Sequence, residues 1–343
     1  METAHTLFSV HRLATSGIFK QIMRHFPQKN KTFAFAYGSG VFQQQGHNDK
    51  SANMLDFIFA VDDPQEWHKQ NMARNPKHYS FLRYLGSHNV ANIQQCYGAG
   101  VYFNTLVPCE GRLIKYGVIS TDALINDLLD WDTLYLSGRL HKPVLTLHRS
   151  SHSQLGSALI SNLQSALHLS LLLLPDTFSE EELYTTITGL SYAGDFRMTV
   201  GEDKNKVRNI VKPNMPHFKG LYTPVIQQLT DHLHWNESRA LFQQSVSAES
   251  RCYHLNLLPK MLVYGLVNKR NADGRNRDAE DILRGLASDS DCEDELKGAL
   301  EDIVKESSWT QSVKGIFTAG FMKSVQYSAS KLKKMWKSKK TDK

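Results

Sequence analysis

The sequence of 343 residues carries 40 lysines and arginines against 34 aspartates and glutamates, a formal net charge of +6. The last thirteen residues, 331–343, hold seven lysines and one acid, so the remaining 330 residues are electrically balanced. Proteins that bind nucleic acid through their body usually carry a basic excess there, and this distribution counts against that class of partner. The longest uninterrupted apolar runs are five residues. A membrane-spanning helix needs about 20 and is therefore excluded.

Four cysteines without a Cys-x-x-Cys pair indicate neither a disulfide framework nor a zinc site. Residues 1–27 contain three basic residues and one acid, with apolar residues at near-helical spacing. This composition is typical of a mitochondrial transit peptide, and equally of a first helix that packs on a domain. We favour the packed helix, because the run leads directly into a predicted strand.

Apolar runs bounded by turn residues predict strands in the first half of the chain. The predicted strands cover 33–37, 54–61 and 113–119, with a further β-prone run from residue 144. Their almost wholly apolar character indicates strands buried on both faces. Helical patterns between them cover 65–85, 121–137 and 153–174.

After about residue 150 helical patterns dominate. Ser179 and Glu182 form a capping-box pattern that predicts a helix start, and 189–201 is expected to be a loop with a short strand. Residues 268–280 are polar and precede an acidic stretch. The expected domains are a sheet-containing domain (1–150), a helical domain (151–267), a polar and acidic linker or helix (268–310) and a basic tail (311–343).

A strand, the turn Gly38-Ser39-Gly40, a polar connection and a second strand bearing Asp56 form the arrangement with most chemical content. Glycine lets the backbone approach a phosphate closely, and amides at a following helix N-terminus can hold phosphate oxygens together with the Ser39 hydroxyl. An unpaired carboxylate is costly in an apolar run, so a metal ion or a cation is expected beside Asp56. Mg²⁺ prefers carboxylates combined with substrate phosphates.

This pattern resembles the nucleotidyltransferase fold, in which a Gly-Ser turn precedes a strand with paired metal-binding carboxylates. The usual pair there is acid, apolar, acid. The matching triplet here is Met54-Leu55-Asp56, so one expected acid is a methionine. Glu202 or Asp203 is a candidate for the second acid, and a solvated surface loop is the alternative.

A series of ordered blocks runs through most of the chain, at 37–42, 54–59, 67–68, 78–80, 114–119, 134–144, 194–198 and 201–207. Together they resemble the mitochondrial translocator assembly and maintenance family, whose members are phosphatidate cytidylyltransferases, or CDP-diacylglycerol synthases. The resemblance implies Mg²⁺-dependent cytidylyl transfer from CTP to phosphatidate. The products are pyrophosphate and CDP-diacylglycerol, a precursor of cardiolipin and phosphatidylglycerol.

The resemblance also implies an α+β architecture. A nucleotidyltransferase-fold domain with a mixed sheet is followed by a mostly helical, winged-helix-like domain and a C-terminal amphipathic helix. The implied location is peripheral, on the matrix side of the inner mitochondrial membrane.

The implied nucleophile is a lipid phosphate oxygen that is already anionic, so the reaction needs positioning and charge stabilisation rather than a general base. The 38–40 turn is expected to hold the triphosphate, and Asp56 to bind Mg²⁺. Lys115 lies on an apolar strand and is expected to face the site, against the alternative of an edge-strand lysine. Arg139 and Lys142 are candidates for clamping the pyrophosphate or the lipid phosphate, and a plain basic turn is the alternative.

The tail combines lysines with apolar residues at helical spacing, a pattern typical of a helix that lies on an anionic membrane surface. Each lysine near such a surface contributes about 1 kcal/mol. The alternative is a frayed basic end that binds nothing. The predicted membrane-binding residues are Phe317, Phe321, Leu332, Lys333, Lys334, Trp336 and Lys337.

Two other functions stay open. A nucleotidyltransferase acting on nucleic acid would need a basic groove on the body, which the balanced charge disfavours. A non-enzymatic assembly factor for protein import would have no need of Asp56 and Lys115 in apolar strands. The expected partners are CTP, phosphatidate and an anionic membrane surface, with no nucleic acid, and a homo-oligomer is left open.

Overall fold

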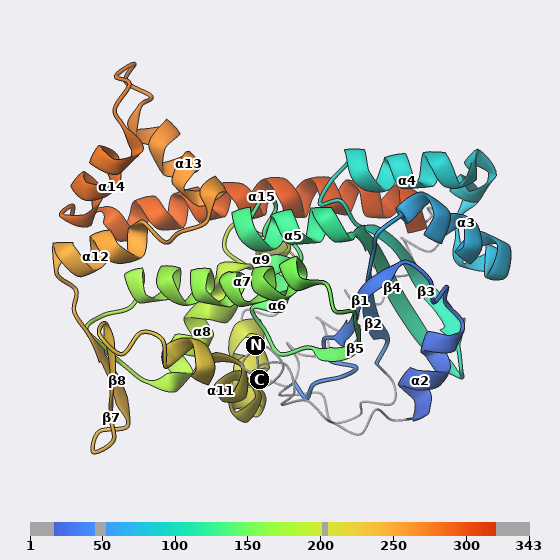
Figure 1. Ribbon diagram of the computed structural model, residues 1–343, viewed down its shortest axis with the longest axis horizontal. Helices are drawn as coiled ribbons and strands as arrows, with labels where there is room; N and C mark the ends of the chain where they lie inside the picture. Colours follow the sequence, from blue (N-terminus) through green and yellow to red (C-terminus); the bar gives the residue numbers. More distant parts are fainter. Residues whose placement is uncertain (1–16, 45–52, 201–204, 320–343) are drawn as a thin grey trace.

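The computed structural model describes residues 17–44, 53–200 and 205–319. Figure 1 shows a twisted sheet with its covering helices on one side of the molecule and a mostly helical region on the other. The long helix α15 (Cys292–Ala319) runs alongside both regions. The chain therefore has the mixed α+β character that its sequence predicts.

The larger sheet has five strands in the order β3-β4-β2-β1-β5. β2 and β4 are parallel and the other neighbours antiparallel, so the sheet is mixed as predicted. Its register places Asp56 of β2 between Tyr37 of β1 and Lys115 of β4. The strands that the apolar runs predicted are β1 (Lys31–Tyr37), β2 (Leu55–Val61), β4 (Arg112–Ser120) and β5 (Leu145–Arg149).

β3 (Tyr102–Cys109) is a strand that the sequence pattern did not predict. Polar residues and a proline interrupt its apolar character, and its pairing with β4 shifts register between Asn104 and Val107. The helix expected over 65–85 is also shorter than predicted. α3 (Pro64–Arg74) ends early, and two 3₁₀ turns lead from it into α4 (Gly86–Cys96).

Alternate residues of the same strands bury the two faces of the sheet. On one face Phe57 and Phe59 pack beneath α2 (Gly17–Arg24) and α3. On the other face Ile58 and Ala60 contact α5 and α7, whose bounds are Thr121–Asp130 and Ser153–Leu172. α2 thus behaves as the packed helix expected near the N-terminus, while residues 1–16 lie outside the described residues.

The second half builds its own core around α7, with a small antiparallel sheet in the order β6-β8-β7. Ser179 and Glu182 form the predicted capping box at the start of α8. The short strand expected within 189–201 is wrong, because a helical turn, α9, occupies that place. The remaining elements are α8 (Glu180–Leu190), α9 (Phe196–Val200), α10 (Lys206–Val211), α11 (Met215–Ile226), β6 (Thr177–Phe178), β7 (Leu233–Asn236), β8 (Leu241–Gln244), α12 (Ala248–Leu255), α13 (Lys260–Arg270) and α14 (Ala279–Ala287).

α15 joins the two halves through two close backbone approaches. A Cβ on Gly194 would lie 2.6 Å from the carbonyl oxygen of Glu301, and a Cβ on Gly98 would lie 2.8 Å from the Gln311 side chain. Both glycines have positive φ, so any other residue would strain the backbone as well. The domain boundary expected at residue 310 falls inside this continuous helix.

Candidate active site

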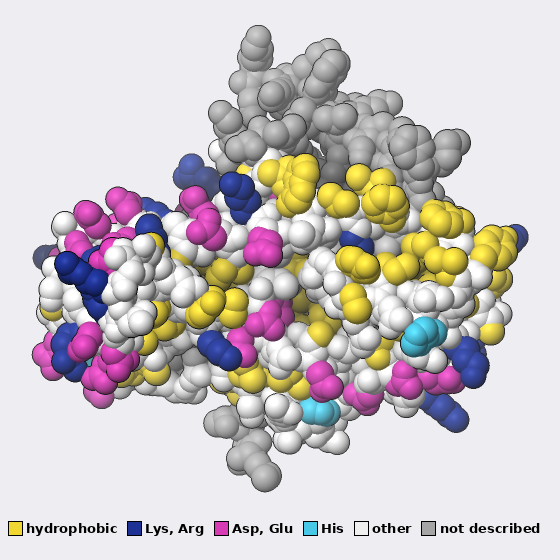
Figure 2. Space-filling model, turned by 90° about the horizontal axis from the view of Figure 1, so that it is seen from above, with side chains coloured by type: hydrophobic (Ala, Val, Ile, Leu, Met, Phe, Trp, Pro, Cys, Tyr) yellow, Lys and Arg dark blue, Asp and Glu magenta, His cyan; other side chains and the backbone are white. Residues whose placement is uncertain are grey.

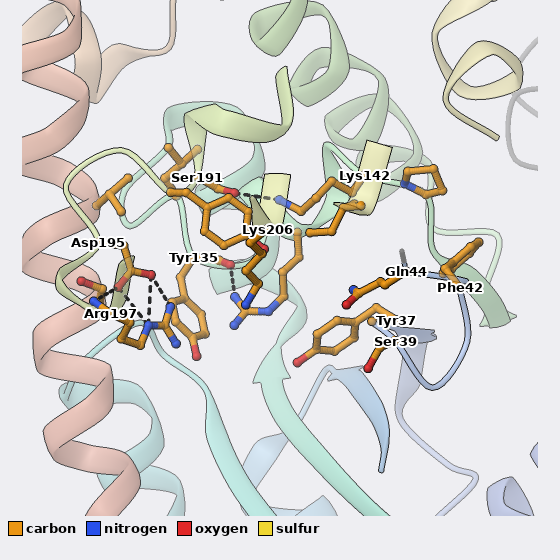
Figure 3. A pocket seen from close by; sticks show the side chains of 18 of the residues that line it. Tyr37, Ser39, Phe42, Gln44, Tyr135, Lys142, Ser191, Asp195, Arg197 and Lys206 are labelled. Atoms are coloured by element: carbon orange, nitrogen blue, oxygen red, sulfur yellow. Dashed lines mark hydrogen bonds and ion pairs between the residues drawn. The ribbon is translucent and has the colours of Figure 1, made fainter. Parts of the chain in front are cut away.

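A pocket of about 260 Å³ opens where β1 ends and β2 and β4 begin, facing the helical half of the chain. The sheet and the turn after β1 form one wall, residues 134–143 a second, and residues 191–197 and 206–218 with α15 a third. Figure 3 shows the basic side chains of Lys142, Arg197 and Lys206 around a common space. Five predicted site residues line it, namely Gly38, Ser39, Lys115, Arg139 and Lys142.

Glycine shapes the turn after β1 at two positions. Gly38 has a φ of +79°, and a Cβ there would lie 3.3 Å from Oδ2 of Asp56. The Gly38 carbonyl accepts hydrogen bonds from the amides three and four residues further on, which closes a single turn where a helix N-terminus was expected. A Cβ on Gly40 would lie 2.7 Å from the Met54 carbonyl oxygen. Gly40 therefore permits the contact with the start of β2 and does not line the pocket.

Three charged groups surround the Tyr37 phenol at the end of β1. The pKa of Tyr37 is raised to about 12, chiefly by burial; Arg139 and Lys115 act to lower it and Asp56 acts to raise it. The strand register places Asp56 opposite Tyr37 and Lys115 opposite Asp56, and the Arg139 guanidinium carbon lies 5.5 Å from the Tyr37 ring centroid. Lys115 faces this site, because it lines the pocket from β4 rather than extending from a sheet edge.

A buried carboxylate, Asp127, positions the basic turn. Trp131 ends α5 in the left-handed conformation, which corrects the longer helix expected over 121–137. Asp127 then accepts hydrogen bonds from the Thr133 amide and hydroxyl at 2.9 and 2.7 Å. It also accepts from the Leu136 and Ser137 amides at 3.0 and 2.8 Å. These bonds fix the start of α6 (Ser137–Leu140), the short helix that carries Arg139.

Side chains of α7 and α11 also form hydrogen bonds with the segment that contains Arg139 and Lys142. The buried Asn162 side chain of α7 accepts from Trp131 Nε1 at 2.9 Å and donates to the Ser137 carbonyl at 3.0 Å. Its oxygen also lies 3.0 Å from Nε2 of His141. The Tyr222 hydroxyl of α11 donates to the His141 carbonyl at 2.9 Å. Both structural halves therefore fix the position of the predicted basic residues.

Arg139 and Lys142 extend from this turn into the pocket. The Arg139 guanidinium carbon lies 3.9 Å from the Tyr135 ring centroid and 5.5 Å from the Tyr37 ring centroid. The guanidinium also donates to the Tyr135 carbonyl. Lys142 Nζ donates to Oγ of Ser191 at 2.7 Å and to a backbone carbonyl of α6. Aromatic stacking fixes the plane of the guanidinium and leaves it at the pocket surface.

Arg197 and Lys206 are two further basic residues of the pocket, and the sequence analysis did not predict either of them as a site residue. Both line the pocket. Arg197 Nε donates to both carboxylate oxygens of Asp195, at 2.9 and 3.0 Å, in a largely buried pair. Lys206 Nζ lies 5.6 Å from the Tyr192 ring centroid, which Lys142 Nζ approaches to 5.1 Å. The signal for them was their place in two of the ordered sequence blocks, 194–198 and 201–207.

Mg²⁺ in proteins is usually bound by one or two carboxylates together with phosphate oxygens of the substrate. Asp56 supplies one carboxylate beside the turn, and Asp195 is engaged by Arg197. Within residues 17–44, 53–200 and 205–319, His, Cys, Asp and Glu form no group of three that could hold a metal ion. The candidates for the second acid, Glu202 and Asp203, lie outside the described residues.

One of the seven predicted membrane-binding residues, Phe317, lies within the part of the chain that the structure describes. Phe317 is exposed near the end of α15 and does not line the pocket. The other six, from Phe321 to Lys337, lie outside the described residues. In the part of the chain that the structure describes, no helix combines the length and apolarity that a bilayer crossing requires.

Comparison with known proteins adds an independent finding. The family model described as mitochondrial phosphatidate cytidylyltransferase matches residues 19–334. A Danio rerio protein of that name is 53% identical over 334 residues, which cover 96% of this chain and 98% of the relative. Proteins of the same name from Xenopus laevis and Bos taurus are 52% and 50% identical, covering 93% and 96% of this chain and 95% and 98% of the relatives. The chain belongs to the mitochondrial phosphatidate cytidylyltransferase family.

Proposed function

We propose that this chain transfers the cytidylyl group of CTP to phosphatidate and produces CDP-diacylglycerol and pyrophosphate. A phosphate oxygen of the lipid attacks the α-phosphorus of CTP and forms a new phosphorus–oxygen bond. The bond from that phosphorus to the bridging oxygen breaks, and pyrophosphate leaves with its electron pair. No proton has to be removed from the nucleophile.

The observation that carries this proposal is the charge of the pocket. Five basic side chains line it, against one carboxylate, Asp195, that Arg197 already pairs with. A triphosphate and a lipid phosphate bring several negative charges into one cavity, and fixed cations stabilise them best where water is excluded. The basic side chains are Lys115, Arg139, Lys142, Arg197 and Lys206.

The chain's own groups divide the work. The amides of Gly38 and Ser39 and the Ser39 hydroxyl hold the triphosphate, and Asp56 with phosphate oxygens would hold Mg²⁺. When bound, Mg²⁺ neutralises part of the triphosphate charge. Arg139, in α6, and Lys142, two residues after the end of that helix, bind the leaving pyrophosphate and the lipid phosphate. Stacking and hydrogen bonds already fix both side chains, so little reorganisation is needed when charge moves.

The architecture supports three finer assignments that belong to the same proposal. The order of strand, Gly-Ser turn and acid-bearing strand supports a nucleotidyltransferase fold for 1–150. The small sheet with helices α7, α8 and α11 supports a winged-helix-like domain for 151–267. The basic pattern of 311–343 supports an amphipathic helix that holds the protein peripherally on the matrix side of the inner mitochondrial membrane.

Purified protein incubated with radiolabelled CTP, Mg²⁺ and phosphatidate tests the reaction directly. We expect label to appear in CDP-diacylglycerol, with pyrophosphate released in equal amount. An RNA acceptor in a parallel reaction should stay unlabelled, because the charge-balanced body offers no groove of the kind that tracks a nucleic-acid backbone. Label in RNA would favour a nucleic-acid nucleotidyltransferase, and label in neither acceptor would favour a non-enzymatic assembly factor.

We also predict that CTP binding takes up a proton at Lys142. Burial, with the neighbouring charges of Arg139 and Lys206, holds the pKa of Lys142 well below its ordinary value. A bound phosphate supplies negative charge and raises that pKa, so a proton is taken up at pH values between the free and bound pKa. Affinity for CTP then falls as the pH rises through that window.

Isothermal titration in two buffers of different ionisation enthalpy measures this proton uptake. The variant Lys142→Met should bind CTP more weakly and lose the uptake. Uptake that persists unchanged in this variant would assign the proton to another group.

A further inference from the structure

A second apolar surface lies on the sheet-containing half of the molecule, outside the tail. The segment that links α3 to α4, together with the end of α4, exposes four large apolar side chains. They are Phe81 (60% exposed), Tyr84 (77%), Leu85 (51%) and Tyr97 (64%). Soluble proteins scatter such residues singly, and a cluster of them on one face marks an interaction site.

The end of α15 adjoins this surface and extends it. Lys314 Nζ donates to the carbonyls of Gln94 and Tyr97 at 2.8 and 2.6 Å, which satisfies the C-terminal carbonyls of α4. With Lys314 turned inward, the neighbouring Ile316 and Phe317 remain exposed, at 48% and 60%. We call the exposed apolar residues of 81–97 and 309–317 the docking surface. Figure 2 shows hydrophobic side chains gathered on the half of the molecule that carries the larger sheet.

The charge of these two segments matches one kind of partner. From Trp67 to Cys109 the sequence contains no aspartate or glutamate and four basic residues. From Ser307 to Ala319, the end of α15, it again contains no acid. Acids are frequent elsewhere, so two acid-free segments that meet in space create a surface suited to negative charge. The Arg83 guanidinium lies 4.7 Å from the Tyr84 ring centroid, which places a cation beside an exposed aromatic residue.

We infer that the docking surface rests on a lipid surface with anionic headgroups and contributes to membrane binding independently of the tail. Exposed aromatic and aliphatic side chains insert at the level of the headgroups, while basic residues pair with lipid phosphates. The inference rests on the proposed function, because a lipid substrate requires the catalytic body to lie close to the bilayer. The inference specifies which face of the catalytic body contacts the membrane.

The test uses the full chain, with its tail, in flotation with vesicles of phosphatidylcholine and phosphatidylglycerol. The variant Phe81→Ser/Tyr84→Ser/Leu85→Ser should bind these vesicles at least about tenfold more weakly than wild type, because three apolar side chains no longer insert. A matched control, Trp235→Ser/Leu257→Ser/Tyr264→Ser, removes side chains of similar exposure (41%, 43% and 58%) from the helical half. The control should bind as wild type does.

Turnover of a short-chain, soluble phosphatidate separates this inference from the proposed reaction. The docking-surface variant should process that substrate at the wild-type rate, since none of its three positions lines the pocket. If the triple variant fails to fold, the single variant Tyr84→Ser decides, because its side chain is mostly exposed and loses little packing. Unchanged vesicle binding would overturn the inference. A conversion of dimer to monomer in light scattering, with vesicle binding retained, would instead assign the surface to a second copy of the chain.

Discussion

Replacing Asp56 by asparagine is expected to lower kcat/KM for cytidylyl transfer by roughly 10²–10³-fold. Asparagine keeps the size of the side chain and removes its charge. Asp56 lies in the register between Tyr37 and Lys115, with its carboxylate beside the Gly38 turn. Asp195, the carboxylate that lines the pocket, accepts hydrogen bonds from Arg197 on both of its oxygens and is already paired.

The control for this prediction is Asp122→Asn, which removes an exposed carboxylate from the first turn of α5 outside the pocket. Steady-state kinetics with soluble phosphatidate should leave that variant within about twofold of wild type, as expected for a surface substitution. Affinity for CTP, titrated with and without Mg²⁺, gives a second reading. If Asp56→Asn kept the wild-type gain in CTP affinity on adding Mg²⁺, the proposed metal role of Asp56 would be wrong.

The variant Arg139→Lys should lose roughly 10²-fold in kcat/KM although it keeps the positive charge. The guanidinium carbon of Arg139 lies 3.9 Å from the ring centroid of Tyr135 and 5.5 Å from that of Tyr37, and the guanidinium donates a hydrogen bond to the Tyr135 carbonyl. A lysine ammonium cannot stack in this way, nor can it present two parallel donors to a phosphate. The loss should therefore appear mainly in kcat, where charge on the leaving group develops.

Arg83→Lys is the matched control, since Arg83 also lies over a tyrosine ring, at 4.7 Å from the Tyr84 centroid, but outside the pocket. With soluble substrates this control should turn over at the wild-type rate. Equal losses in both variants would show that stacked arginines matter for stability rather than for the chemistry. A thermal unfolding curve for each variant separates these two explanations.

The centre of the site could be predicted because its residues break a simple pattern. Asp56 and Lys115 are charged residues in otherwise apolar strands, and Gly38 with Ser39 ends another strand. Such exceptions are visible in sequence, since an apolar strand excludes charge unless a site requires it. The parallel pairing of β2 with β4, which brings Asp56 level with Lys115, is a long-range event that no local pattern specifies.

The remainder of the site depends on contacts between distant segments. Arg197 lies in the pocket because Gly194, three residues earlier, has no side chain and lets the backbone of this loop lie against the backbone of α15 at Glu301. Arg139 is placed by the buried Asp127 and by Asn162 of α7, neither of which stands out in the sequence. β3 was not predicted for a related reason. Its sequence contains polar residues and a proline, so it lacks the continuous apolar run or the regular alternation by which a strand is recognised.

The continuity of α15 has a consequence for the pocket. Ser308 lines the pocket and Phe317 belongs to the docking surface, nine residues further along the same helix. At 1.5 Å per residue this separation is about 14 Å. Trp309, which directly follows Ser308, is also exposed and belongs to the docking surface. One continuous helix therefore carries both a wall of the pocket and part of the proposed membrane-binding face, so a shift of this helix on a lipid surface would be transmitted to Ser307 and Ser308 in the pocket.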